Sequence, residues 1–246
     1  MRVLYKIWLF CIRSINLYNF RKYYKSYKII PFGCYCLPRV IAKHNKLKPS
    51  KKEGEESFPF DLCFSNFDSN VKLFGTKFDN FYNGFRYDIQ DGTNGRKCWY
   101  NESINMICNH DTMSSFEQFK VRYDNRINNL YTVIEKTDKY LFFLVASMEP
   151  IKNSQVDLFV KEIAKYRDMK TFSIIIINQS KEQVYYISEN VYCIDLSKDE
   201  RFEKMGAGLW RVKIKRAKNL DAMLFNSQIN RELLKIIKSK KHLWKK

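Results

Sequence analysis

The chain has 246 residues, of which 45% are hydrophobic and 16% are aromatic. This length and composition predict one large domain or two small ones with a substantial core, and they exclude a disordered chain and a small disulfide-stapled scaffold. The formal net charge of +18 lies mostly at the two ends: residues 1–30 hold seven Lys or Arg and no acid, and residues 198–246 hold fifteen against five.

Two basic ends around a nearly neutral middle favour an anionic partner such as a membrane surface. A compositional bias toward Lys explains the same charge without any partner. The sequence shows neither a recognisable nucleic-acid-binding module nor a glycine loop for phosphate, so nucleic acid is not an expected partner.

Residues 1–27 are predicted to form a basic amphipathic segment. Leu4, Ile7, Trp8, Cys11 and Ile15 fall at helical spacing, and most of the basic residues fall elsewhere. Such a helix lies on an anionic membrane or packs on the domain's own core, and both interpretations stay open. The apolar run is interrupted by a lysine, is far shorter than the roughly 20 residues that span a bilayer, and has no small-residue cleavage site after it. We therefore expect neither a spanning helix nor a signal peptide.

Residues 28–32 are predicted to form a short strand that ends at Gly33, and a helix is predicted from Pro38 to about residue 47. Proline fits the first turn of a helix, where its missing N–H costs nothing. Cys34 and Cys36 lie in the turn between strand and helix. A helix N-terminus lowers the pKa of a nearby thiol from about 8.5 into the range of about 3.5–7.5. Gly33 would let backbone N–H groups approach a substrate oxygen and form an oxyanion site. The alternative is a buried, inert cysteine.

The middle of the chain contains several further predicted elements. Residues 67–88 carry aromatic residues at spacings that predict amphipathic helix, and residues 97–108 look extended. A helix start at 114–117 precedes a helix that should run to about residue 135.

The second half alternates apolar runs with helices. Runs at 141–145, 172–177 and 191–196 surround an amphipathic helix at 155–167, and a basic helix is predicted at about 219–238. This alternation is typical of βαβ units with a parallel sheet buried on both faces. We predict an α/β fold, a three-layer domain over residues 28–200 with a mostly parallel sheet and the nucleophile at the first strand–helix turn. Residues 201–246 form a basic C-terminal extension in this interpretation, and a papain-like α+β fold is the alternative.

A catalytic base for a thiol must come from one of three histidines. His110 follows an extended apolar stretch and is the best placed, whereas His44 is expected on an exposed helix face and His242 lies in a basic tail. Three sulfurs and an imidazole from Cys34, Cys36, Cys108 and His110 would suit tetrahedral zinc, but one-residue spacing is unusual for such sites and no metal is predicted. The seven cysteines are odd in number and irregularly spaced, which indicates reduced thiols and a cytoplasmic protein.

Four motifs together carry a family resemblance. Gly33–Cys36, Phe58-Pro59-Phe60-Asp61, the His110-Asp111 pair and an arginine-bearing helix at 122–126 resemble a family of bacterial proteins labelled papain-like cysteine peptidases, often encoded among genes for surface-polysaccharide synthesis. The likeness covers about residues 28–180. It implies Cys36 as nucleophile, His110 as base and Asp61 as the residue that orients His110. The sequence departs from the pattern in having a second cysteine, Cys34, and in having Leu62 where a tryptophan-like residue is usual.

These observations predict a Cys–His enzyme of the papain-like cysteine peptidase type that acts on acyl or amide bonds of a peptide-like or glycan substrate. Arg122 or Arg126 would bind an anionic substrate group. A polysaccharide acyltransferase that uses a coenzyme A thioester is the first alternative, and a non-catalytic binding or scaffold protein is the second. A hydrolase of this kind needs no cofactor. The expected location is the cytoplasm, with the basic ends able to meet the inner face of the membrane.

Overall fold

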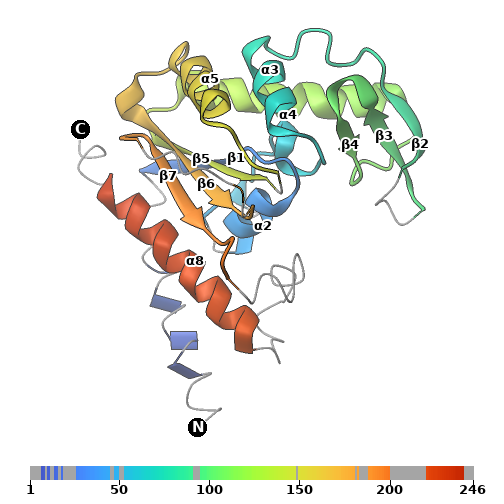
Figure 1. The fold of residues 1–246 in the computed structure, drawn as a ribbon. Coiled ribbons are helices and arrows are strands. Elements are labelled where there is room, and N and C mark those ends of the chain that lie inside the picture. The colour runs from blue at the N-terminus through green and yellow to red at the C-terminus, as the bar shows by residue number, and fades with distance from the viewer. Residues whose placement is uncertain are drawn as a thin grey trace.

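The computed structural model describes residues 26–44, 47–49, 53–90, 95–147, 149–180, 182, 188–199 and 220–240, and seven positions between 7 and 18. Four parallel strands pair side by side in the order β1 (Tyr27–Pro31), β5 (Tyr140–Ser147), β6 (Phe172–Asn178) and β7 (Val191–Asp195). A separate antiparallel sheet holds β2 (Arg86–Ile89), β3 (Lys97–Asn101) and β4 (Met106–Cys108). The chain therefore has a mixed α/β fold with a parallel main sheet (Figure 1), as the alternation of apolar runs and helices predicts.

With the exception of α3, the helices lie close to their predicted positions. They are α2 (Leu37–His44), α3 (Phe67–Gly75), α4 (Phe116–Lys136), α5 (Asn153–Ala164) and α8 (Leu220–Ser239), with short 3-10 turns η2 (Pro59–Asp61), η3 (Glu102–Ile104) and η4 (Met169–Thr171). Ser115 caps α4 by accepting a hydrogen bond from the Gln118 N–H, which confirms the predicted helix start.

The core is built around β5, whose eight residues are all buried. Because successive side chains of a strand point to opposite faces, both faces of this strand are covered. On one face, Phe159 of α5 stacks on Phe32 with ring centroids 4.2 Å apart and meets Phe143 edge-on at 5.4 Å. At the far edge of the sheet, α8 packs along β7 (Figure 1).

The helix predicted over residues 67–88 is shorter than expected. It ends at Gly75, and the chain then passes through a series of turns to β2. Lys77, Phe78 and Asn80 have positive φ angles of 53°, 61° and 55°, which no helix accommodates. The aromatic spacing correctly predicts burial, since Phe78 and Phe81 belong to the core, but burial in this segment is achieved by turns.

The stretch 97–108 forms a hairpin and not one extended strand. Asn105, in the left-handed conformation with φ 49°, ends η3 and turns the chain from β3 into β4. Figure 1 shows this small sheet at one end of the long helix α4.

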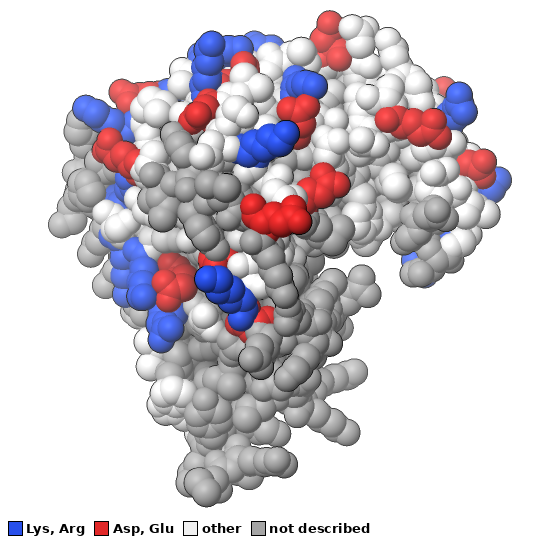
Figure 2. Space-filling view, in the orientation of Figure 1, with Lys and Arg blue, Asp and Glu red and all other residues white. Residues whose placement is uncertain are grey.

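Several predicted features lie outside the described residues. These include most of segment 1–27, residues 201–219 and His242, and nothing is described of the His44 side chain. Among the described residues, no helix has the combination of length and hydropathy needed to cross a bilayer. Figure 2 shows Lys, Arg, Asp and Glu interspersed over the described surface of one face.

Candidate functional site

Cys36 occupies the turn that joins β1 to α2. Backbone pairing to the neighbouring strand continues past β1, because the Phe32 N–H donates to Leu144 (2.8 Å) and the Cys34 N–H to Ala146 (3.0 Å). The chain then turns, and the Cys36 carbonyl accepts the first helical hydrogen bond, from the Val40 N–H at 3.0 Å. Cys36 is therefore the N-cap residue of α2, at the carboxyl edge of a parallel sheet, where ligands of α/β proteins bind.

Gly33 is required in this turn by close packing. A Cβ atom on Gly33 would lie 2.4 Å from Pro38 Cγ and 2.9 Å from the Tyr35 carbonyl oxygen. The Gly33 carbonyl accepts a hydrogen bond from Asn70 Nδ2 at 3.0 Å. Glycine therefore allows the helix start to fold back against the end of β1.

The backbone hydrogen bonds of the turn show which N–H groups remain candidates for the predicted oxyanion site. The Cys34 N–H is bonded to Ala146 and cannot serve. The N–H groups of Leu37 and Arg39 belong to the first helical turn, where backbone donors have no acceptor inside the helix. These two N–H groups are therefore candidate oxyanion donors on the helix side of Cys36.

Cys36 differs from the cysteines around it in exposure. Cys34, Cys63 and Cys108 are 6%, 1% and 0% exposed. Burial raises the pKa of Cys34 and of Cys63 to about 12 and raises that of Cys108 well above its usual range, so these thiols stay protonated at neutral pH. Cys36 is only partly buried. Of the two cysteines in the turn, burial therefore favours Cys36 as the reactive one. All seven cysteines are free thiols.

His110 lies two residues beyond β4, in a tight turn closed by the Asp111 N–H and the Cys108 carbonyl at 3.0 Å. Its side chain is exposed, whereas Asp111 is fully buried. One segment links this turn to Cys36: the Ser65 N–H donates to the Cys34 carbonyl (2.7 Å), and Phe64 bridges Ile107 in both directions. The two sequence-distant motifs are thus separated by a single stretch of backbone, and their direct contact stays a prediction.

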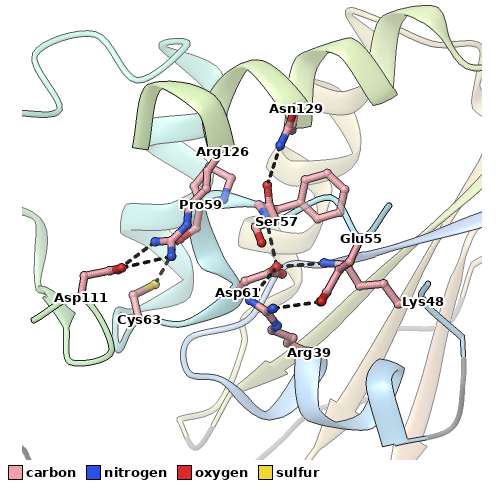
Figure 3. Close-up of polar contacts among 11 residues, drawn as sticks. Arg39, Lys48, Glu55, Ser57, Pro59, Asp61, Cys63, Asp111, Arg126 and Asn129 are labelled. Atoms are coloured by element: carbon pink, nitrogen blue, oxygen red, sulfur yellow. Dashed lines mark hydrogen bonds and ion pairs between the residues drawn. The ribbon is translucent and has the colours of Figure 1, made fainter. Parts of the chain in front are cut away.

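Asp61 lies at the centre of a buried polar network (Figure 3). Its Oδ2 accepts hydrogen bonds from Lys48 Nζ at 2.8 Å and from the Phe58 N–H at 3.1 Å, and it lies 3.3 Å from Arg39 Nη1. Burial lowers the pKa of Lys48 in spite of the neighbouring carboxylate. Arg39 also pairs with Glu55 at 2.8 Å. Asp61 therefore holds the turn that contains the Pro-Phe-Asp motif.

The second carboxylate oxygen of Asp61, Oδ1, is the atom that could accept a hydrogen bond from His110 and orient its ring. Oδ1 is buried and has no hydrogen-bond partner among the described residues. A His110 imidazole would have to use this atom, because Oδ2 is occupied. The role of Asp61 as orienter stays a prediction.

Asp111 forms ion pairs with both arginines that are predicted to bind substrate, Arg122 and Arg126. Arg126 donates two hydrogen bonds to it, at 2.8 and 3.1 Å, and Arg122 donates one at 2.8 Å. Arg126 is buried, but the side chain of Arg122 is 47% exposed. Both line an open groove of about 810 Å³ between α4 and the segment 55–62, together with Arg39 and Glu55. The arginines therefore face a groove, while their charge is shared with a buried carboxylate.

Three polar residues near the turn were not predicted. Ser147, the last residue of β5, hydrogen-bonds Cys34, and Gln179, just after β6, donates to the Tyr35 hydroxyl. Lys48 pairs with Asp61. Ser147 and Gln179 follow the apolar runs at 141–145 and 172–177, and the carboxyl ends of parallel strands share one edge. This rule, applied to the predicted strands, would have placed both beside the turn.

Among the described residues, no group of three or more His, Cys, Asp or Glu side chains is placed to hold a metal ion. All four residues of the alternative zinc set are described, so the structure does not assemble that site.

No family model matches the chain, and no curated protein or solved structure matches it either. The site must therefore be judged on its own geometry.

Proposed function

We propose that the chain is a cysteine-dependent enzyme of the papain-like peptidase type that cleaves or transfers acyl or amide groups, with Cys36 as the nucleophile. In this proposal the parallel sheet is the middle of a three-layer domain. The complete burial of β5 on both faces supports that arrangement. The substrate is peptide-like or a glycan, and the setting implied by the sequence motifs is cytoplasmic assembly of a surface polysaccharide.

One observation carries the proposal. Cys36 is the partly exposed N-cap residue of α2, and the cysteines nearest to it in the core are buried and protonated. The N-terminal end of a helix carries a partial positive charge that stabilises a thiolate. A structural cysteine has no need of this position.

The proposed reaction has two steps. The Cys36 thiolate adds to the carbonyl carbon of the substrate, and the leaving amine or alkoxide takes a proton from His110 as the C–N or C–O bond breaks. The neutral His110 then removes a proton from water or from an acceptor hydroxyl, which attacks the thioester. The C–S bond breaks and releases the Cys36 thiolate, and the proton stays on His110, so that both groups return to the state in which the first step began. The N–H groups of Leu37 and Arg39 stabilise the oxyanion in both steps.

Hydrolase and transferase share the first step and differ in the acceptor. If the acyl donor is a coenzyme A thioester, the bond that breaks first is C–S, and a glycan hydroxyl then receives the acyl group. Coenzyme A is in that case a co-substrate.

Acyl trapping tests the proposal. The protein is incubated separately with p-nitrophenyl acetate and with acetyl-coenzyme A and quenched in acid, and acetylated cysteines are located by peptide mass spectrometry. We expect the acetyl group on Cys36, formed faster than on the exposed Cys11, which serves as an internal reference. Acetylation by the coenzyme A thioester favours the transferase, and acetylation by the ester alone favours the hydrolase.

The His110→Ala variant tests the base. We expect slower acetylation of Cys36 and an unchanged rate at Cys11. Equal rates at the two cysteines in the unaltered protein would contradict the proposal and favour a non-catalytic binding protein.

A further inference from the structure

The described residues near the N-terminus present an exposed apolar face. Ile7, Trp8, Phe10, Ile15 and Tyr18 are helical, and between 53% and 70% of their surface is exposed. At the helical spacing of 3.6 residues per turn, the sequence positions 7, 8, 10, 15 and 18 fall within one half of a helical wheel. So large an apolar face in contact with water costs free energy unless another surface covers it.

A basic stripe lies on α8. Arg231, Lys235 and Lys238 follow one another at spacings of four and three residues and are exposed, and Glu232 pairs with the first two. The opposite side of the helix, with Leu233 and Ile237, is buried in the core. Figure 1 shows α8 and the N-terminal residues on the same side of the molecule, opposite to α3 and α5.

The positive charge of residues 1–30 and of the stripe on α8 indicates which kind of partner covers the apolar face. Residues 1–30 contain seven Lys or Arg and no acid. A second copy of the chain in contact through this face would bring like charges together, which opposes association. An anionic bilayer offers both an apolar interior for the aromatic side chains and negative headgroups for the basic ones.

We propose that the apolar face formed by Ile7, Trp8, Phe10, Ile15 and Tyr18 and the basic stripe of α8 form a docking surface for an anionic lipid bilayer. The apolar side chains enter the interfacial region, and Arg231, Lys235 and Lys238 face the headgroups. The protein is then held at the membrane from the side that carries α8 and the described residues near the N-terminus. This inference does not depend on the proposed enzymatic function.

Co-sedimentation of the full chain with vesicles tests the proposal. We expect binding to vesicles of phosphatidylcholine with phosphatidylglycerol, weak binding to phosphatidylcholine alone, and loss of binding at high ionic strength, which screens the charges. The double variant Trp8→Glu/Phe10→Glu should abolish binding. The matched control is Ile89→Glu, which alters a residue of β2 that is 52% exposed and should bind as the unaltered protein does.

The contribution of α8 is tested by Arg231→Gln/Lys235→Gln. Each basic residue near an anionic surface strengthens binding about fivefold, so this variant should bind about 25-fold more weakly. If this variant binds as tightly as the unaltered protein, α8 is not part of the docking surface, and the proposal is overturned.

Two other results overturn the proposal. The first is a full chain that does not bind anionic vesicles at low ionic strength. The second is a dimer in sedimentation velocity that Trp8→Glu/Phe10→Glu dissociates while vesicle binding stays unchanged, because the apolar face would then belong to a second copy.

Discussion

The turn at 33–36 and the charged network around Asp61 and Asp111 are stabilised by different kinds of interaction. The turn is held by backbone hydrogen bonds to β5 and by the packing of Gly33 on Pro38, and it leaves Cys36 partly exposed. The network is held by charged side chains that bind one another in the interior. A charged residue inside this protein is thus mainly a structural element, whereas the thiol of Cys36 is partly exposed at the start of a helix.

This contrast bears on which residues are expected to act in catalysis and which are expected to stabilise the fold. Asp61, Arg122 and Arg126 carry charges and lie in motifs, so they invite a catalytic role, but the described contacts of Asp61 Oδ2 and of both arginines are ion pairs and hydrogen bonds within the chain. The contrast predicts that altering the network costs mainly stability and that altering the turn changes the local geometry of the thiol.

The largest effect is expected from Arg126→Met. This change keeps the apolar stem of the side chain and removes two hydrogen bonds from the fully buried Asp111. Breaking a buried pair leaves an under-compensated charge, and the free energy of unfolding in urea should fall by about 3–5 kcal/mol.

Lys120→Met on the same helix is the matched control. Its pair with Asp124 is exposed, and the loss should stay within about 1 kcal/mol. Similar losses for the two variants would show that burial does not distinguish the network from surface pairs.

The second prediction concerns Gly33→Ala. The added Cβ would overlap Pro38 and the Tyr35 carbonyl, and we expect a loss of about 1–3 kcal/mol in the free energy of unfolding. In Gly75→Ala the atoms nearest to the new Cβ belong to the Glu162 side chain, whose carboxyl end can shift, and alanine favours a helix, so stability should be unchanged or higher. A Gly33→Ala protein as stable as the unaltered one would show that the turn is loosely packed.

The third prediction uses the pH dependence of stability. The pKa of Cys34 is about 12 in the folded chain, against 9.0 for an unperturbed thiol. Because the folded state holds this proton more tightly, the stabilisation is complete below pH 9 and is lost progressively as the pH rises toward 12. Urea denaturation at several alkaline pH values should show a slope that Cys34→Ala reduces by up to about 1.4 kcal/mol per pH unit. Parallel curves for the two proteins would place the Cys34 thiol in contact with water.

The smallest effect is expected from Tyr35→Phe. The Tyr35 hydroxyl accepts a hydrogen bond from Gln179 and joins the turn to the end of β6. Its removal should lower the free energy of unfolding by about 0.5–1.5 kcal/mol and leave the fold intact. No loss of stability would indicate that water replaces the hydroxyl without cost.

The strands and helices were predictable where the pattern of apolar residues fits one type of secondary structure only. The run Leu141–Val145 and the spacing of Phe119, Tyr123 and Leu130 each have one interpretation, and β5 and α4 confirm them. The segment 67–88 was not predictable, because residues such as Lys77 and Phe78 adopt positive φ, which neither spacing nor propensity indicates.

The candidate site was predictable only in its turn. Strand, glycine, cysteine and proline in succession predict the geometry around Cys36. Asp61 and Arg126 have partners 13 and 15 residues away, and no local pattern shows that burial will pair these charges.

The proposed function requires that the N-terminus of α2 activates the Cys36 thiol. The most direct test is the rate of alkylation by iodoacetamide near pH 7, measured for each cysteine by peptide mass spectrometry. Cys11 is exposed and serves as the reference thiol within the same chain, and Cys34 as the buried one. We expect Cys36 to react faster than Cys11 although it is less exposed, and Cys34 hardly to react. A Cys36 that reacts more slowly than Cys11, or at the same rate as Cys34, would show that the helix does not activate this thiol.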